Sequence, residues 1–479
     1  MKFINLHGHT SHSSGDGHKL PEDHVKRVKE LGMKALAITE HGNTSSHVQL
    51  EKAAEKHGIK PIYGVEAYVA KPDTQQKFHQ TILAMNEKGY RQLNHLVTRS
   101  YEEGFFHYPT VHTDWLMDKE QTSDLILLSG CADSWLSSVL AGGKSEGEKL
   151  VDNLEVDFDD KELADALSER FDRAVDLAKK FKDVYGTRYY LELQLFDNYP
   201  RTRYLNQQIE KISQIVGLPV VATGDVHYPH PEDWEIQRLS NSIAWNVPVD
   251  QLAERRDYEA GKAAYPTSDR EVATRLLATG VSRKTVKAAI ANTQEVAYRC
   301  NVKLPKTTPV RYSGSRNALE SMDLLKEKIM EGIKYRQETS PAFKEHFKAN
   351  QSDYKAQLKK ELDVILPRAG FPDYFLVNWQ VISWAKENGI AVGPARGSAA
   401  SSLVCYLLRI TEVNPMEFPQ MVFERFLDPG REDEPDIDTD YPDDRRNEVF
   451  EFARREYGEA NVGNIGNFSR YREIGRAHV

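Results

Sequence analysis

The sequence has little cysteine and no long apolar run. Its three cysteines, Cys131, Cys300 and Cys405, cannot form the paired disulfide framework of a small secreted domain. No stretch approaches the roughly 18 apolar residues of a membrane-spanning helix, and the first residues lack the apolar core of a signal peptide. These absences exclude a disulfide scaffold and predict a cytoplasmic protein with no membrane partner.

The sequence also has no excess of positive charge. It contains 63 Lys and Arg against 72 Asp and Glu, a net charge of −9 at pH 7. Long-range attraction of the whole chain to nucleic acid is therefore not expected. A short basic cluster at Lys355, Lys359 and Lys360 is more typical of a solvated helix face than of a DNA groove. Because metal-binding carboxylates are counted in this total, nucleic-acid chemistry at a local site is still compatible with it.

The first 235 residues alternate short apolar runs with amphipathic segments. Seven strands are expected, at residues 3–6, 35–39, 61–65, 80–85, 125–129, 189–195 and 219–223. Helices are expected between several of them, at residues 22–31, 46–56, 165–181 and 203–216. Repeated strand–helix units favour a parallel sheet that can close into a barrel. Since seven strands are one short of the common eight, the predicted fold is an irregular α/β barrel.

Three further regions are expected after the barrel domain of residues 1–235. Residues 236–355 read as a mostly helical connecting region with many charged residues. Residues 356–450 form a compact region rich in apolar residues and glycine, and residues 451–479 follow it. The length of the chain fits roughly two to four domains.

Candidate metal ligands follow the apolar runs of the barrel region. His7-Gly8-His9 and Asp225-Val226-His227 each place two ligands two residues apart, where strand geometry turns both to the same face. Parallel α/β barrels build their sites at the carboxyl ends of strands. We therefore expect one pocket lined by nine side chains: His7, His9, Asp16, His41, Glu66, His79, Cys131, Asp225 and His227.

The chemistry of these ligands suggests the ions and the reaction. Imidazole and carboxylate groups with one thiolate suit Zn²⁺, Mn²⁺ or Fe²⁺, and nine ligands are enough for two or three ions. Clustered divalent ions activate water and stabilise phosphate charge, which predicts phosphoester hydrolysis. Taken alone, His79 or Cys131 would more often be an ordinary surface or core residue, so the prediction depends on the paired spacings.

A second candidate site lies near the end of the chain. Residues 392–402 form a loop of small residues before an apolar helix, and such a loop exposes backbone N–H groups to an anion. Arg396 could add a bidentate phosphate contact. Close packing is the commoner reason for a loop of this kind, so the loop alone is weak evidence.

The acidic motif at residues 435–440 is more specific. In a strand, Asp436 and Asp438 point to one face and could hold paired Mg²⁺ ions. Arg425, Arg445 and Arg446 could offset phosphate charge or form surface ion pairs. An exposed acidic turn is the alternative interpretation.

Residues 1–235 resemble a PHP (polymerase and histidinol phosphatase) domain. The matching stretches are LHGHT (6–10), AITEHGN (37–43), GVEAYV (64–69) and ATGDVHY (222–228). One departure is Glu40, where that family usually has Asp. The resemblance implies that all nine ligands are intact, and that the domain is a metal-dependent 3′–5′ exonuclease with Asp225 and His227 in catalytic roles.

The later region resembles the palm of the C family of bacterial replicative DNA polymerases, the DNA polymerase III alpha subunits. The matching stretches are GF (370–371), YFLV (374–377), WAK (384–386), GI (389–390), GPARGS (393–398), FERFL (423–427) and PDID (435–438). The resemblance implies a mixed α+β partial palm in which Asp436 and Asp438 ligate Mg²⁺, followed at residues 451–479 by the truncated start of a thumb. Deoxynucleoside triphosphates would be bound by Arg396, Gly397, Ser398, Arg425 and Arg445.

The same resemblance implies partners and missing parts. Primer–template DNA is the expected substrate, and a sliding clamp and other replisome subunits are the expected partners of the full-length protein. A third catalytic aspartate, the fingers and the clamp-binding region would lie beyond Val479. We therefore expect a truncated reading frame, with residues 474–479 non-native and no polymerase activity. The alternatives are a histidinol-phosphatase-type enzyme and a scaffold whose metals only stabilise the fold.

Overall fold

The computed structural model describes residues 2–72, 74, 76–142, 161–254, 258–305, 310–428, 430 and 435–464. Contacts divide the chain into two compact units, Met1–Pro305 and Lys306–Val479. Residues 474–479, which we expected to be non-native, lie outside the described residues.

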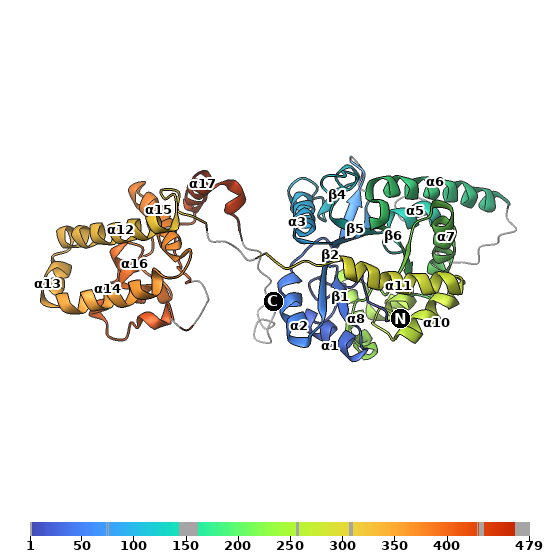
Figure 1. The fold of residues 1–479 in the computed structure, drawn as a ribbon, viewed down its shortest axis with the longest axis horizontal. Helices are drawn as coiled ribbons and strands as arrows, with labels where there is room; N and C mark the ends of the chain where they lie inside the picture. The colour runs from blue at the N-terminus through green and yellow to red at the C-terminus, as the bar shows by residue number, and fades with distance from the viewer. Residues whose placement is uncertain are drawn as a thin grey trace. The chain divides into compact units, whose positions relative to one another are not determined.

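The first unit is built on a curled seven-stranded sheet surrounded by helices (Figure 1), which confirms the predicted irregular α/β class. The strands run in the order β1-β2-β3-β5-β6-β7, with β4 beside β2. Their bounds are β1 Ala35–Ile38, β2 Lys60–Ala70, β3 Phe78–Ala84, β4 Thr110–His112, β5 Leu125–Leu128, β6 Tyr189–Gln194 and β7 Val220–Thr223.

The sheet is mixed, whereas we expected a parallel one. Strand β3 is antiparallel to both β2 and β5, and the other pairs are parallel. The connection from β2 to β3, residues 71–77, is too short for the crossover that a parallel neighbour requires. The chain therefore turns back on itself at this point.

The expected strand at residues 3–6 is not a regular strand. Asn5 forms an isolated parallel bridge with Leu36 of β1, and Gly8 forms one with Val226 just after β7. The N-terminal segment thus joins the two edges of the sheet. Strand β4 was not predicted, because three residues are too few to stand out as an apolar run.

Alternation of side chains buries both faces of the sheet. Leu36 and Leu127 pack into the larger outer core, while Ala37 and Leu128 face an inner core. Residues near the end of α11 also join the inner core, among them Cys300.

The helices of this unit extend past residue 235, because α10 and α11 pack with the barrel although we placed them in a connecting region. Their bounds are α1 Pro21–Glu30, α2 His47–His57, α3 Glu87–Glu102, α4 Thr113–Leu116, α5 Trp135–Ala141, α6 Lys161–Tyr185, α7 Pro200–Val216, α8 Trp234–Trp245, α9 Tyr258–Gly261, α10 Asp269–Ala278 and α11 Arg283–Arg299.

The second unit consists of helices and short turns. The helices are α12 Ala318–Thr339, α13 Pro341–Ala349, α14 Gln351–Ile365, α15 Phe371–Glu387, α16 Leu403–Leu407 and α17 Arg446–Tyr457. Its described residues contain no β-strand, so the expected mixed α+β character is not seen there. Residues 435–440 carry no assigned strand, because a single backbone hydrogen bond to Gly393 does not make the ladder of a sheet. A segment becomes a strand only when a partner segment pairs along its backbone.

A buried carboxylate positions the start of α16. Glu361 of α14 accepts hydrogen bonds from the backbone N–H groups of Leu403 and Val404, at 2.8 and 3.0 Å, and from the Ser402 hydroxyl at 2.7 Å. Burial raises the pKa of Glu361. These bonds satisfy N–H groups at the helix start and fix the loop that precedes it.

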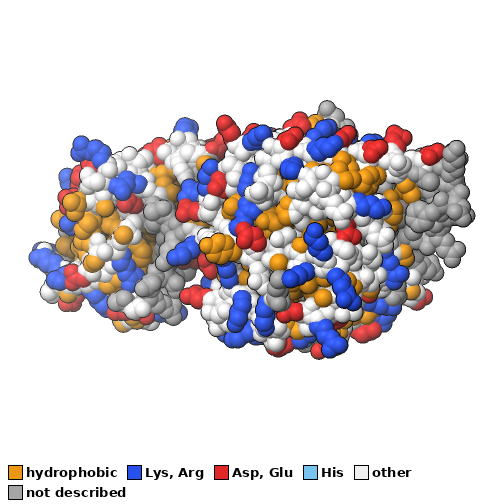
Figure 2. All heavy atoms as spheres, turned by 45° about the vertical axis from the view of Figure 1, so that its right-hand side comes forward, with side chains coloured by type: hydrophobic (Ala, Val, Ile, Leu, Met, Phe, Trp, Pro, Cys, Tyr) orange, Lys and Arg blue, Asp and Glu red, His pale blue; other side chains and the backbone are white. Residues whose placement is uncertain are grey.

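The surface carries charges of both signs. On the face drawn in Figure 2, Lys and Arg side chains are interspersed with Asp and Glu, in keeping with the lack of excess positive charge. Every helix in the described part of the chain is too short or too polar to cross a bilayer.

Candidate metal centre and second acidic site

Glu66 lies at the centre of a cluster of imidazoles in the first unit. Its Oε1 is 3.3 Å from His7 Nε2 and 3.3 Å from His79 Nδ1. Its Oε2 is 3.2 Å from His9 Nε2 and 3.0 Å from His41 Nδ1. We expected Glu66 to follow a strand, but it lies within β2, which is longer than predicted.

Asp225 approaches the same imidazoles from the end of β7. Its Oδ1 lies 3.4 Å from His7 Nε2 and 3.5 Å from His9 Nε2. The backbone of Asp225 has a φ of 41°, a left-handed conformation that non-glycine residues adopt mainly where the surrounding structure enforces it. The turn directs this carboxylate into the cluster.

The remaining predicted ligands lie around this centre. Asp16 Oδ2 is 2.6 Å from His41 Nε2 and 3.2 Å from His227 Nε2. Cys131 Sγ is 3.6 Å from His79 Nδ1. The structure therefore brings all nine predicted side chains together.

The facing atoms of this cluster are chemically incomplete. Five of them are buried and have no well-directed hydrogen bond: His7 Nε2, His9 Nε2, His41 Nδ1, Glu66 Oε1 and Asp225 Oδ1. Proteins leave few buried polar atoms without a partner. Imidazole nitrogens and carboxylate oxygens that converge in this way fit a divalent cation.

More than one cation would fit. Three overlapping groups each have donor atoms within 4.8 Å of one another: His7, His9 and Glu66; His9, His41 and His227; His41, Glu66 and His79. The groups overlap, because His9, His41 and Glu66 each belong to two of them.

The cluster is closed on one side and open on the other. The side chains of His7 and His9 are fully buried, and that of Glu66 is 2% exposed. Those of Asp16 and His79 are 32% and 27% exposed. A substrate would therefore approach from the side of Asp16 and His79.

Opposite charges stabilise one another inside the cluster. Burial disfavours ionisation of Glu66, yet the imidazoles of His79, His7 and His41 hold its pKa well below the usual range. Burial likewise opposes protonation of His227, but Asp16 and Asp225 raise its pKa to about 9. Burial and the nearby carboxylates raise the pKa of the Cys131 thiol.

Two polar residues of β6 orient the cluster and were not predicted. Glu192 Oε1 lies 2.8 Å from His7 Nδ1, and its Oε2 accepts the backbone N–H of Gly130 at 3.1 Å. Gln194 Nε2 donates to Asp225 Oδ2 at 3.0 Å. The signal was available, because Glu192 and Gln194 occupy alternate positions in an otherwise apolar strand.

Glu40 acts on the cluster through a hydroxyl. It accepts hydrogen bonds from Thr10 Oγ1 at 2.6 Å and from Ser13 Oγ at 2.5 Å. The Ser13 hydroxyl in turn lies 3.1 Å from His9 Nδ1. Burial opposes ionisation, but His9 and the two hydroxyls lower the pKa of Glu40. This carboxylate thus orients a ligand, while His41 beside it faces the centre.

The acidic motif of the second unit has a different arrangement. Arg396 Nη2 lies 2.9 Å from Asp438 Oδ1, and Arg396 Nε lies 3.2 Å from Asp440 Oδ1. The Arg396 side chain is 55% exposed. A hydrated ion pair, with no orphaned buried atoms, therefore occupies this position.

The small-residue loop and the acidic segment are docked on each other. Gly397 has a φ of 65°, which favours glycine, and a Cβ there would lie 2.5 Å from Asp438 Oδ2. Gly393 N donates to Asp440 O at 3.0 Å, and Ile437 N donates to Tyr374 Oη at 3.1 Å.

The other predicted residues of this site are dispersed. Asp436 and Arg425 are exposed, and Ser398 is half-buried in a short 3₁₀ turn. Arg445 pairs with Glu448, with two N–O distances of 2.8 Å. Among the described residues, neither arginine pairs with Asp436 or Asp438.

Each of the two units contains a segment that matches a known protein family. Residues 5–195 match the model of the PHP domain, and residues 323–476 match that of the bacterial DNA polymerase III alpha NTPase domain. The PHP match, together with the His and Glu clusters, indicates divalent metal binding in the first unit.

Similar curated proteins carry one name. DNA polymerase III subunit alpha of Helicobacter pylori is 32% identical over 489 residues, which cover 98% of this chain and 37% of that protein. Those of Buchnera aphidicola and Escherichia coli strain K12 are each 32% identical, covering 99% of this chain and 38% of theirs. The chain therefore spans less than two-fifths of the curated relatives that it matches.

A solved amidohydrolase structure from Chromobacterium violaceum also aligns with part of the chain. It is 15% identical and covers 50% of this chain and 96% of its own, with a TM-score of 0.26. That score is too low to support an argument.

Proposed function

The chain belongs to the DNA polymerase III alpha family, and we propose that its first unit is a metal-dependent 3′–5′ exonuclease acting on DNA. The observation that carries this proposal is the convergence of nine donor side chains with unsatisfied buried atoms. Hydrolysis of a phosphodiester is a reaction that clustered divalent ions catalyse.

Two or three Zn²⁺, Mn²⁺ or Fe²⁺ ions held there would activate water and stabilise the charge of the phosphate. The buried residues His7, His9 and Glu66 supply rigid ligands. His227 Nδ1 lies 2.8 Å from the backbone oxygen of Asp225. Donation from Nδ1 would leave Nε2, which lies 3.2 Å from Asp16 Oδ2, available as a ligand on the open side, where we place Asp225 and His227 beside the reacting phosphate.

We propose that the second unit contributes to nucleotidyl transfer in the longer proteins of this family. Asp436 and Asp438 would ligate Mg²⁺, and Arg396 would exchange its carboxylate partner for a nucleotide phosphate. Gly397, Ser398, Arg425 and Arg445 would line the same site. In those longer proteins, primer–template DNA and deoxynucleoside triphosphates would be the substrates of this site. A sliding clamp and other replisome subunits would be the partners of the whole protein.

The exonuclease is tested by trimming of a 3′-end-labelled single-stranded oligonucleotide with Mn²⁺ present. Asp225→Ala and His9→Ala should each abolish trimming, whereas Asp176→Asn, an exposed change on α6, should not. Undiminished trimming in either ligand variant would refute the assignment. Hydrolysis of a small phosphomonoester without DNA trimming would favour the phosphatase, and bound metal with neither activity would favour the scaffold.

A further inference from the structure

Four aromatic side chains are exposed together on the first unit. They lie at the end of α3 and in the loop before β4: Tyr101, Phe105, Phe106 and Tyr108, which are 48%, 56%, 49% and 53% exposed. Large exposed apolar groups that gather in one place commonly mark a binding surface. We call these four residues the aromatic platform.

The loop holds its rings in a defined hairpin. Phe106 N donates to Tyr108 O at 3.2 Å, and the two residues form an antiparallel bridge. His107 between them has a φ of 61°. A Cβ on Gly104 would lie 1.9 Å from Thr110 O, so glycine is required where the loop begins. The rings are therefore presented by the fold and not left on a free chain.

The platform is continuous with the metal centre. The Tyr68 ring lies 4.9 Å from that of Tyr108, 5.3 Å from that of His79 and 5.8 Å from that of His41. One aromatic ring thus separates Tyr108 from two proposed metal ligands. The cluster is also open on the side of His79.

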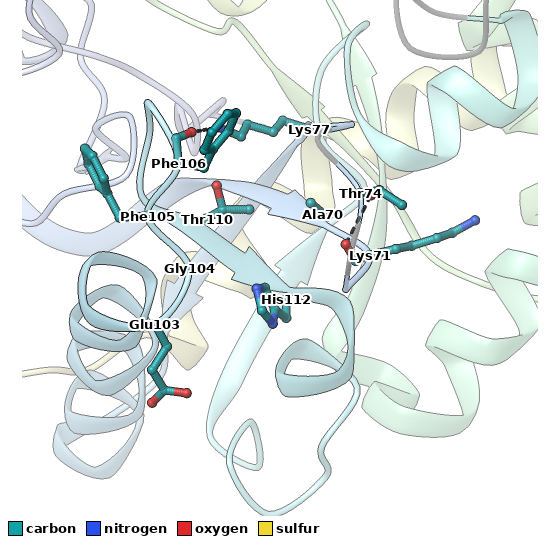
Figure 3. Close-up of a pocket in the computed structure, with 10 residues that line it drawn as sticks. All are labelled: Ala70, Lys71, Thr74, Lys77, Glu103, Gly104, Phe105, Phe106, Thr110 and His112. Carbon is teal, nitrogen blue, oxygen red and sulfur yellow. Dashed lines mark hydrogen bonds between the residues drawn. The ribbon is translucent and has the colours of Figure 1, made fainter.

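Positive charge lies beside these rings. The Lys77 ammonium is 5.6 Å from the ring centre of Phe106 and 5.1 Å from that of Tyr108. Figure 3 shows Lys77 reaching to Phe106, whereas the side chain of Lys71, which also lines the pocket, extends away from the rings. Glu103 also lines the pocket, but its carboxylate is paired with Arg99 at 2.8 and 2.9 Å. The pocket therefore presents one cation, Lys77, beside aromatic rings.

We propose that the aromatic platform binds the unpaired 3′ end of a DNA strand and leads it to the metal centre. Bases would stack on Phe106 and Tyr108, and Lys77 would contact a phosphate. Aromatic stacking binds single strands with little sequence preference, and it does not need the bulk positive charge that this chain lacks. This inference rests on the proposed exonuclease for its purpose, but binding is separable from hydrolysis.

The test measures binding of the full chain in EDTA, by fluorescence anisotropy of a labelled single strand of about 12 nucleotides. Phe106→Ala and Tyr108→Ala should each weaken binding roughly tenfold, and Tyr108→Phe should restore it. Tyr298→Ala is the matched control, because Tyr298 is a 78% exposed aromatic residue on α11 of the same unit. Equal affinity of the alanine variants and the wild type would overturn the proposal.

An oligonucleotide of the same length without bases distinguishes stacking from phosphate attraction. It should bind the wild type at least about tenfold more weakly than the normal strand. Equal binding of the two strands would overturn the stacking role. Base-dependent binding without trimming in Mn²⁺ would support the platform and refute the exonuclease. If the wild type trims DNA but the alanine variants bind the single strand as tightly as the wild type does, the role of the aromatic platform is refuted and the exonuclease is not. A protein partner would then be the remaining candidate occupant of the platform.

Discussion

The two acidic sites of this chain are built in opposite ways. Glu66 is 1% exposed, and several atoms around it have no hydrogen-bond partner. Asp438 is partly exposed and paired with Arg396. Buried charges without hydrogen bonds are costly unless a bound ion compensates them, whereas a hydrated ion pair requires no ligand. We therefore expect the first site to need a bound ion and the second to be stable without one.

The strongest test replaces one central carboxylate in each site. Glu66→Gln should remove most of the bound metal and lower trimming by more than about 100-fold, beyond what loss of an outer partner usually causes. Asp438→Asn should leave both quantities unchanged. Elemental analysis and the trimming assay measure them. If Glu66→Gln and Asp438→Asn changed the bound metal and the trimming rate equally, the proposed difference between the two sites would be wrong.

The next prediction concerns the outer partner of His7. Glu192→Gln should weaken metal affinity by about 10- to 100-fold, because its carboxylate orients the imidazole and increases its basicity. Competition with a chelator of known affinity measures the change. An unaltered affinity would mean that packing alone orients His7.

Acid should destabilise the barrel through a buried imidazole outside the ligand set. Burial lowers the pKa of His47 to about 4, whereas an unfolded histidine titrates near 6.5. Below about pH 6.5 the unfolded state binds a proton that the folded state excludes, so stability falls as the pH falls toward 4. The free energy of unfolding should drop by about 2 kcal/mol between pH 7 and pH 5 from this group.

Urea denaturation at both pH values checks this contribution. In the wild type, His47 Nε2 lies 3.0 Å from the carbonyl oxygen of Gly64, and the amide of His47→Gln can still donate to that oxygen. The variant should lose the roughly 2 kcal/mol fall in unfolding free energy between pH 7 and pH 5 that we assign to His47. An identical pH dependence in the variant would show that His47 titrates normally.

The smallest effect is expected at the exposed ion pair. Arg396→Ala should change the free energy of unfolding by less than about 1 kcal/mol, because solvent-exposed pairs contribute little. Thermal unfolding provides the measurement. A larger loss would mean that the pair is a structural element of the second unit, which would weaken its proposed role in binding phosphate.

Sequence reasoning grouped the side chains of the proposed metal centre because several of them follow strands in short, regular spacings. His7, His9, Asp225 and His227 were recognisable for that reason. Glu192 was missed although it is a charged residue in an apolar strand. The Tyr108 loop was missed because nothing local relates it to His79. The resemblance implied a mixed α+β palm, but the described residues of the second unit carry no strand, since strand formation depends on a distant partner.

The sequence by itself determined which side chains are available for metal chemistry and the alternation that turns them inward. The tertiary structure alone decided that β3 runs antiparallel, that Glu66 stands at the centre of the cluster and that an aromatic loop adjoins it. Periodicity is a property of neighbouring residues and can be read along the chain. Register, burial and convergence depend on contacts between residues far apart, which only folding brings about.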